Sequence, residues 1–369
     1  MKNNSWEQKT DKIKKILITN AGGSPSTNFV RSLRRAPEKF YLIGVDCNKY
    51  YLQRAETDEK HLVPSKDDKD YVNVLNQIIE ETGAEFIHFQ NSAEIEIISE
   101  KREMLKTKFF LPAKETIRIC QNKFESYRKW EENGLPQPKT LFLNNEDDLK
   151  KAFEVLGDGI WLREIKGSGG RGSLLTKSFK EAKSWIDFKE GWGKFTAADY
   201  LSPQSITWQS IWHNGELVVA QTRKRLYWEL AKISPSGITG STGGAITVSD
   251  PMVDDIAQKA ILAIDGKPHG IFSVDMTYDK NNAPNPTEIN IARFFTTHEF
   301  FTRAGLNMPY IFIKLAFGEP YPEIKKKINP LPENLAWIRG MDFLPVLTTV
   351  DEIEKYEEKY KKRLKNKKS

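Results

Sequence analysis

A glycine-rich stretch, IWLREIKGSGGRGSLL at residues 160–175, combines backbone freedom with positive charge. Positions 167–172 contain four glycines, and the cations nearby are Arg163, Lys166 and Arg171. Glycine has no Cβ, so its backbone can bend sharply and approach a ligand closely, while free N–H groups converge on an anion. The pattern predicts a loop that covers phosphates or, alternatively, a hairpin turn with a solvated basic rim. It is not a Walker motif, because no Lys-Ser or Lys-Thr pair follows the last glycine.

A second set of residues has oxygen ligands at metal-binding spacing. Glu288 and Asn290 are two apart on a predicted strand, so both side chains lie on one face, while the isoleucines that alternate with them lie on the other. Asp275 precedes the turn at 279–286 and can meet them from the partner strand. Two carboxylates and an amide oxygen suit Mg²⁺, which usually also keeps waters and substrate phosphates. The sequence therefore favours a metal site over an exposed strand with alternating polar residues.

Strands that alternate with helices precede both motifs. Apolar runs predict strands at 14–23, 40–48 and 84–90, and amphipathic patterns predict helices at 26–36, 71–83 and 94–106, the first capped by Ser26 or Thr27. This alternation predicts a parallel α/β sheet. After a further helix that ends near Gly134, short apolar segments and turns predict antiparallel strands and hairpins. The residues after Pro322 are rich in Lys and Glu, and we expect them to be peripheral.

The first turn of the predicted sheet raises the question of a dinucleotide site. A glycine turn follows the first strand, and Asp46 ends the second. However, NAGGSPSTN is not G-x-G-x-x-G, and Pro25 lies inside it. A crevice for a small substrate at the carboxyl ends of the strands is the better prediction.

Composition narrows the class of protein. The 369 residues are 39% apolar and 29% charged, with two cysteines and no apolar run of the roughly 20 residues that a membrane helix needs. The polar N-terminus lacks the features of a signal peptide, and we expect a cytoplasmic protein without disulfides. The net charge of +6 equals that of residues 355–369, so the remainder is near neutral. A solvated helix end is preferred over nucleic-acid or lipid binding for this basic segment.

Residues 14–321 resemble the ATP-grasp superfamily, with the closest likeness to the carbamoyl phosphate synthetase large subunit and the carboxylate–amine ligases. The resemblance implies an α/β fold with a Rossmann-like pre-ATP-grasp domain (12–120), a lid subdomain (121–195), an antiparallel ATP-grasp subdomain with the metal site (196–322) and a peripheral tail (323–369). A single grasp module without a duplicated half argues against a carbamoyl phosphate synthetase itself.

The resemblance assigns roles to individual residues. ATP, with Mg²⁺ or also Mn²⁺, is the implied cofactor, and Asp275, Glu288 and Asn290 correspond to the metal ligands. The implied nucleotide-binding residues are Lys123, Arg163, Gly167, Ser168, Gly169, Gly170, Arg171, Gly172 and the adenine hinge Asp199, Tyr200 and Leu201.

The chain departs from the family pattern at three places. Arg163 is followed by Glu164, where members usually have proline after the basic residue. Ser205 stands nearest the position of the family's ribose-binding Glu. The family's E-x-N-P-R motif becomes EINIAR, so Arg293, the implied catalytic contact to a phosphate together with Arg163, comes one residue late.

Segment 221–248 lies where such enzymes hold substrate. Arg223 and Arg225 would share a strand face and can clamp a carboxylate, although a solvated basic edge strand is nearly as good an interpretation. GITGSTGG, at 237–244, is a second flexible loop near the expected site.

The implied activity is ATP-dependent ligation of a small carboxylate to an amine through an acyl phosphate. The partners would be small molecules, not nucleic acid or membrane, and a homodimer is possible. The alternative is a degenerate ATP-grasp protein that binds nucleotide or a partner without catalysis, supported by the three departures. A nicotinamide-dependent oxidoreductase is disfavoured by the first turn.

Overall fold

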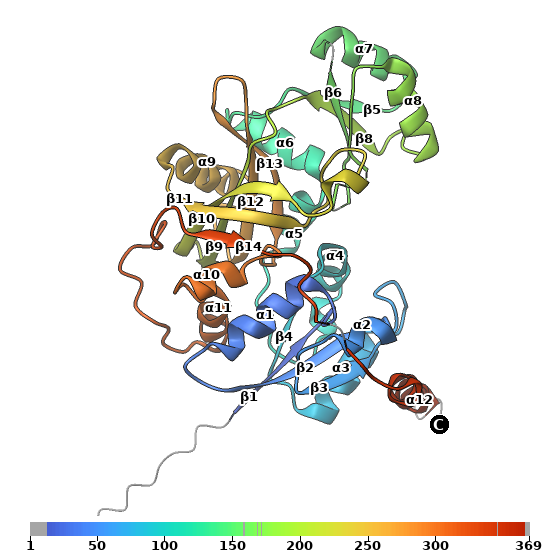
Figure 1. Ribbon diagram of the computed structural model, residues 1–369, viewed down its shortest axis with the longest axis vertical. Coiled ribbons are helices and arrows are strands. Elements are labelled where there is room, and N and C mark those ends of the chain that lie inside the picture. Colours follow the sequence, from blue (N-terminus) through green and yellow to red (C-terminus); the bar gives the residue numbers. More distant parts are fainter. Residues whose placement is uncertain (1–12, 158, 168, 171, 345, 366–369) are drawn as a thin grey trace, which may run out of the picture.

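A computed structural model describes residues 13–365, with the exception of 158, 168, 171 and 345. It contains three sheets connected in chain order (Figure 1). The first is parallel and the other two are antiparallel. The mixed α/β fold class predicted from the sequence is confirmed.

The first sheet has the strand order β3-β2-β1-β4 and carries apolar side chains on both faces. Its strands are β1 (Lys14–Ile18), β2 (Phe40–Asp46), β3 (Glu59–Leu62) and β4 (Phe86–His88). Its helices are α1 (Ser24–Arg34), α2 (Lys49–Gln53), α3 (Tyr71–Thr82), α4 (Ser92–Glu100) and, after the 3₁₀ turn η1 (Arg102–Met104), α5 (Lys114–Gln121).

Helix α1 begins earlier than the predicted cap at Ser26 or Thr27. Its N-cap is Gly23, and Pro25 lies in its first turn. Proline is favoured there, because its missing N–H would have no helical partner and its fixed φ suits the helix. The glycine turn therefore leads directly into the helix.

The second sheet, β5-β8-β6-β7, lies at the end of the molecule remote from the first sheet (Figure 1). Its elements are α6 (Lys123–Glu132), which leads into it, β5 (Thr140–Leu143), α7 (Glu146–Leu156), β6 (Ile160–Glu164), β7 (Leu174–Thr176), α8 (Phe179–Phe188) and β8 (Phe195–Asp199). A small separate core beneath α7 and α8 includes Leu149, Leu162 and Ile186. This sheet carries the glycine-rich loop between β6 and β7.

The third sheet is the largest, with the order β13-β12-β9-β10-β11-β14, and lies between the other two (Figure 1). Its strands are β9 (Ser205–His213), β10 (Glu216–Trp228), β11 (Thr242–Val248), β12 (Gly270–Tyr278), β13 (Pro284–Ile291) and β14 (Ala336–Ile338). The helical elements of this region are η2 (Ala231–Ile233), α9 (Pro251–Leu262), α10 (Glu299–Arg303) and α11 (Met308–Phe317).

The C-terminal segment, expected to be peripheral, adds an edge strand to the third sheet and a surface helix beside the first. Strand β14 pairs with β11, and α12 (Val350–Lys365) lies beside β3 and α2 of the first sheet (Figure 1). The side chain of Arg363 is 4% exposed and pairs with Glu81. The Lys- and Glu-rich sequence provided no indication of these contacts, because a few anchoring residues are enough to hold a helix whose other side chains are solvated. The domain limits themselves stay a prediction.

No helix within the described residues has both the length and the apolar character needed to cross a membrane.

Candidate active site

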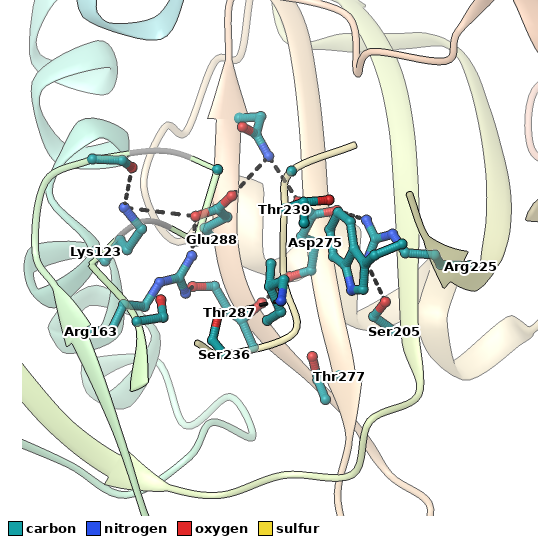
Figure 2. Close-up of a pocket in the computed structure, with 18 of the residues that line it drawn as sticks. Lys123, Arg163, Ser205, Arg225, Ser236, Thr239, Asp275, Thr277, Thr287 and Glu288 are labelled. Carbon is teal, nitrogen blue, oxygen red and sulfur yellow. Dashed lines mark hydrogen bonds and ion pairs between the residues drawn. The ribbon is translucent and has the colours of Figure 1, made fainter. Parts of the chain in front are cut away.

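A cavity of ≈ 620 Å³ lies among the three sheets and gathers most of the predicted site residues. The parallel sheet supplies residues after β1 and β4, the second sheet supplies the glycine-rich loop and the β8 end, and the third supplies β9 to β13. Figure 2 shows cations and carboxylates converging on the cavity from β6, α6, β10, β12 and β13.

The three predicted metal ligands form one cluster. Asp275 and Glu288 stand directly opposite each other on β12 and β13, so their side chains share a face. The Asn290 amide nitrogen donates to Asp275 Oδ2 at 2.9 Å and to Glu288 Oε1 at 3.2 Å. Thr207 on the adjacent strand β9 donates its hydroxyl to Asp275 Oδ1 at 2.5 Å. Hard oxygen donors are thus concentrated at one end of the cavity.

Two cations face this cluster, one from strand β6 of the second sheet and one from helix α6, which leads into that sheet. Arg163 on β6 donates to the Thr287 carbonyl at 3.0 Å and to the Glu288 carboxylate. Lys123, the first residue of α6, lies 3.8 Å from Glu288 Oε2 and donates to the Gly167 carbonyl at 2.8 Å. Figure 2 shows both cations pointing at Glu288.

Burial and neighbouring charge shift the pKa values of these groups. Burial, reinforced by the charge of Arg163, lowers the pKa of Lys123 to about 8. Burial opposes ionisation of Glu288, yet Arg163, Lys123 and Arg293 together hold its pKa below the ordinary value. The lysine is therefore close to losing its proton, whereas the carboxylate stays charged at neutral pH.

The glycine-rich loop depends on backbone conformations that favour glycine. Gly167, Gly169 and Gly170 have φ values of 130°, 70° and 68°. A Cβ on Gly172 would lie 2.3 Å from the Glu164 carboxyl carbon, and one on Gly170 would lie 2.6 Å from the Ile238 carbonyl. The loop therefore packs tightly against both its own strand and the loop around Ile238. Ser168 and Arg171, also predicted to bind phosphate, lie outside the described residues.

The predicted adenine hinge also lines the cavity. Asp199, Tyr200 and Leu201 follow β8, and the Asp199 carboxylate accepts from the Lys139 backbone N–H at 3.2 Å. Trp161 places its ring 6.3 Å from that of Tyr200 and also lines the cavity. The aromatic rings of Trp161 and Tyr200 offer a surface that suits the planar base of a nucleotide. Ser205, at the expected ribose position, instead accepts a hydrogen bond from Arg225.

Arg293 reaches the acidic cluster in spite of its shifted position in the sequence. Ala292, with φ of 61°, follows the end of β13 in a left-handed conformation that is unusual for alanine. This turn takes up the extra residue. Arg293 then donates to the Asn290 side-chain oxygen and, through Nε, to Ser92 Oγ at 2.7 Å.

Arg223 and Arg225 lie two residues apart on one face of β10, and both line the cavity. They share the Thr242 hydroxyl, which accepts from Arg225 Nε at 2.9 Å and from Arg223 at 3.3 Å. The guanidinium carbon of Arg225 lies 3.6 Å from the Trp228 ring centroid, and that of Arg223 lies 4.3 Å from the Phe295 ring centroid. Arg223 is only 3% exposed, so the solvated edge strand is the wrong interpretation of this pair.

The crevice predicted at the carboxyl ends of the parallel strands forms part of this cavity, although the sequence did not single out its residues. Asn20 follows β1, and Gln90, Asn91 and Ser92 follow β4, and all line the cavity. Their position follows the rule that ligands bind beyond the carboxyl ends of parallel strands. The second glycine loop was noticed, and residues 236–240 do line the cavity.

Asp46 does not offer a free carboxylate for a dinucleotide ribose. Its oxygens accept from the backbone N–H groups of Gly22 at 3.1 Å and Asn48 at 2.9 Å, and the residue is buried. It closes the glycine turn against the second strand. The carboxylate is thus already engaged by the turn that made nicotinamide binding the disfavoured interpretation.

Comparison with known proteins places this geometry in a familiar fold. No family model matches the sequence. Among solved structures, the biotin carboxylase domain of 2-oxoglutarate carboxylase from Hydrogenobacter thermophilus aligns with a TM-score of 0.66 at 18% identity, over 88% of this chain and 73% of that one. L-amino acid ligase from Bacillus licheniformis gives 0.64 at 14% identity, over 82% and 74% of the two chains. N5-carboxyaminoimidazole synthetase from Staphylococcus aureus gives 0.61 at 16% identity, over 84% and 78%. The chain thus has the ATP-grasp fold that these enzymes share.

Proposed function

We propose that this protein is an ATP- and Mg²⁺-dependent ligase that activates a small carboxylate as an acyl phosphate for attack by an amine. The observation that carries the proposal is the meeting of an oxygen-rich cluster, the buried cation Lys123, the half-buried cation Arg163 and a glycine-rich loop in one cavity. The solved structures of the same fold include complexes described as containing ADP, MgADP and bicarbonate.

The residues present fit a divalent metal bound with nucleotide. Asp275 and Glu288 supply carboxylate oxygens from adjacent strands, and Asn290 supplies an amide that would turn its oxygen toward the metal. When bound, Mg²⁺ neutralises charge that develops on the transferring phosphoryl group. The set is of the oxygen type that Mg²⁺ and Mn²⁺ accept.

The remaining residues position and screen the reactants. Lys123 and Arg163 offer donors to phosphate oxygens, and the glycine-rich loop excludes water when it covers them. Arg293 bridges the acidic cluster and the parallel sheet, where an acyl phosphate would form. The chain needs no nucleophile of its own, because the amine attacks the activated carbonyl and phosphate departs. A cytoplasmic location and a homodimer stay predictions; a dimer is described for the 2-oxoglutarate carboxylase domain.

A non-catalytic nucleotide-binding protein is the second candidate. The observation that favours it is Ser205, whose hydroxyl accepts from Arg225 at the place where a ribose-binding carboxylate is expected. Such a protein would bind ATP through its base and phosphates without turnover.

Glu288→Gln separates the two candidates. We expect the parent to bind ATP more tightly with Mg²⁺ than without it in calorimetry, and to form ADP with at least one acid and amine pair from a panel. The variant should still bind ATP but lose the Mg²⁺-linked gain and at least about 100-fold of ADP formation, because metal placement depends on that charge. Glu132→Gln, at the exposed end of α6, is the matched control. A parent that binds ATP indifferently to Mg²⁺ and forms no ADP with any pair supports the non-catalytic protein.

A further inference from the structure

Arg223 is a buried cation that forms no ion pair with any carboxylate among the described residues. Its guanidinium meets the Thr242 hydroxyl at 3.3 Å and the face of Phe295, and its Nε has no hydrogen-bond partner within the described part of the chain. Burial, with the charge of Arg225, lowers its pKa, but a guanidinium still carries its charge at neutral pH. An uncompensated buried charge is costly, so a bound anion would relieve it.

Arg225 has a different environment although it is only two residues away. Its guanidinium lies 4.0 Å from Asp275 Oδ1 and also contacts Ser205 and Thr242. It is therefore the arginine beside the metal cluster, where the reacting carboxylate must meet the phosphate. Arg223 is the one without a role in that step.

The strand register places Arg223 in line with the acidic cluster, with strand β9 between Arg223 and Asp275. Residues directly opposite one another across β13, β12, β9 and β10 are Glu288, Asp275, Thr207 and Arg223. Neighbouring strands lie about 4.8 Å apart, so the backbone of Arg223 is about 10 Å from that of Asp275. Unlike Arg225, Arg223 forms no ion pair with Asp275 across this distance.

We infer that one substrate carries a second anionic group, which does not react and which Arg223 holds, apart from the carboxylate that is activated. The inference rests on the proposed function. The group is a carboxylate or a phosphate monoester, carried by the acid or by the amine. Phe295 beneath the guanidinium and Thr242 beside it keep the arginine oriented for a planar or tetrahedral oxyanion.

Binding without turnover tests the inference. Thermal unfolding and calorimetry of the parent, with MgADP present and at constant ionic strength, would compare matched pairs: succinate with butyrate, aspartate with β-alanine, and O-phosphoserine with serine. We expect at least one doubly anionic probe to bind at least about tenfold more tightly than its partner. Arg223→Gln should abolish that preference and, because it removes an unpaired buried charge, should leave the melting temperature of the ligand-free protein unchanged or raise it.

The controls distinguish failure of the inference from failure of the proposed function. Arg128→Gln, exposed on α6, should keep the preference, and Arg223→Lys should keep part of it if Arg223→Gln does not fold. A parent that binds MgADP but shows no preference in any pair overturns the inference, as does a preference that survives in Arg223→Gln and in Arg223→Lys without loss. Absence of MgADP binding instead contradicts the proposed function.

Discussion

At the scale of single residues, the cations of the site form ion pairs with the carboxylates of Asp275 and Glu288. Lys123 is the clearest example, because it is 7% exposed, faces Glu288 at 3.8 Å and has a pKa of about 8. A phosphate placed beside it adds negative charge and favours the protonated amine. Nucleotide binding and protonation of Lys123 are therefore linked.

We expect MgATP binding to take up about one proton at pH 9 and much less at pH 7, where the lysine is already charged in the free protein. The affinity for MgATP should fall as the pH rises above about 8. Calorimetry in two buffers of different ionisation enthalpy measures the uptake, and Lys123→Met should abolish it. Equal binding enthalpies in both buffers at pH 9 would contradict the link.

At the scale of elements, residues 339–344, which follow β14 and are here called the strap, connect the third sheet to the first. Arg339 donates Nε to the Thr242 carbonyl at 2.8 Å and a second nitrogen to Ser241 Oγ at 2.8 Å, and it pairs with buried Asp342. The Asp342 carbonyl in turn accepts from Arg31 of α1 at 2.8 Å. The strap thus holds the start of β11, where the Thr242 hydroxyl accepts hydrogen bonds from both Arg223 and Arg225.

Arg339→Met should loosen this start of β11 without unfolding the protein. We expect amide exchange at residues 239–243 to become about tenfold faster, in proportion to the loss of one or two hydrogen bonds to a charged group. Exchange in β1 and β4 should not change. Arg128→Met is the control, and protection at 239–243 equal to that of the parent would show that the strap does not hold the loop.

At the scale of the whole molecule, the cavity needs all three sheets, and helix α4, which follows β4 of the parallel sheet, holds a buried carboxyl group. Glu94 of α4 is buried, accepts hydrogen bonds from Thr19 at 2.7 Å and from the Tyr71 hydroxyl, and has a pKa raised by burial to about 7. The folded state therefore binds this proton more tightly than the unfolded chain does. The contribution of Glu94 to the free energy of unfolding is fully present below about pH 4.5 and is lost as the pH rises through 7.

Glu94→Gln should remove that dependence. We expect the parent to lose up to about 3 kcal/mol of unfolding free energy between pH 4.5 and 7.5 relative to the variant, which keeps a neutral side chain throughout. Urea unfolding at several pH values measures the difference. Glu100→Gln, exposed on the same helix, should follow the parent. Parallel pH profiles for the parent and Glu94→Gln would show that Glu94 is not protonated in the folded protein.

The sequence alone was enough to predict the α/β class, the glycine-rich loop and the grouping of Asp275, Glu288 and Asn290. These features are local: a strand period of two places Glu288 and Asn290 on one face, and a single turn brings Asp275 opposite Glu288. Helices α7 and α8 and strand β3 were missed, because short amphipathic segments in a polar chain give weak periodic signals.

Only the tertiary structure decided how distant segments meet. Sequence spacing carries no information on the contact between Arg339 and Thr242, on the docking of α12 beside β3, or on the left-handed Ala292 that returns Arg293 to the cluster. Nor could it show that Arg223 is buried without a carboxylate while Arg225 lies beside Asp275. Burial and pairing depend on which strands become neighbours, and that is settled by the packing of the whole chain, not by the residues within one strand.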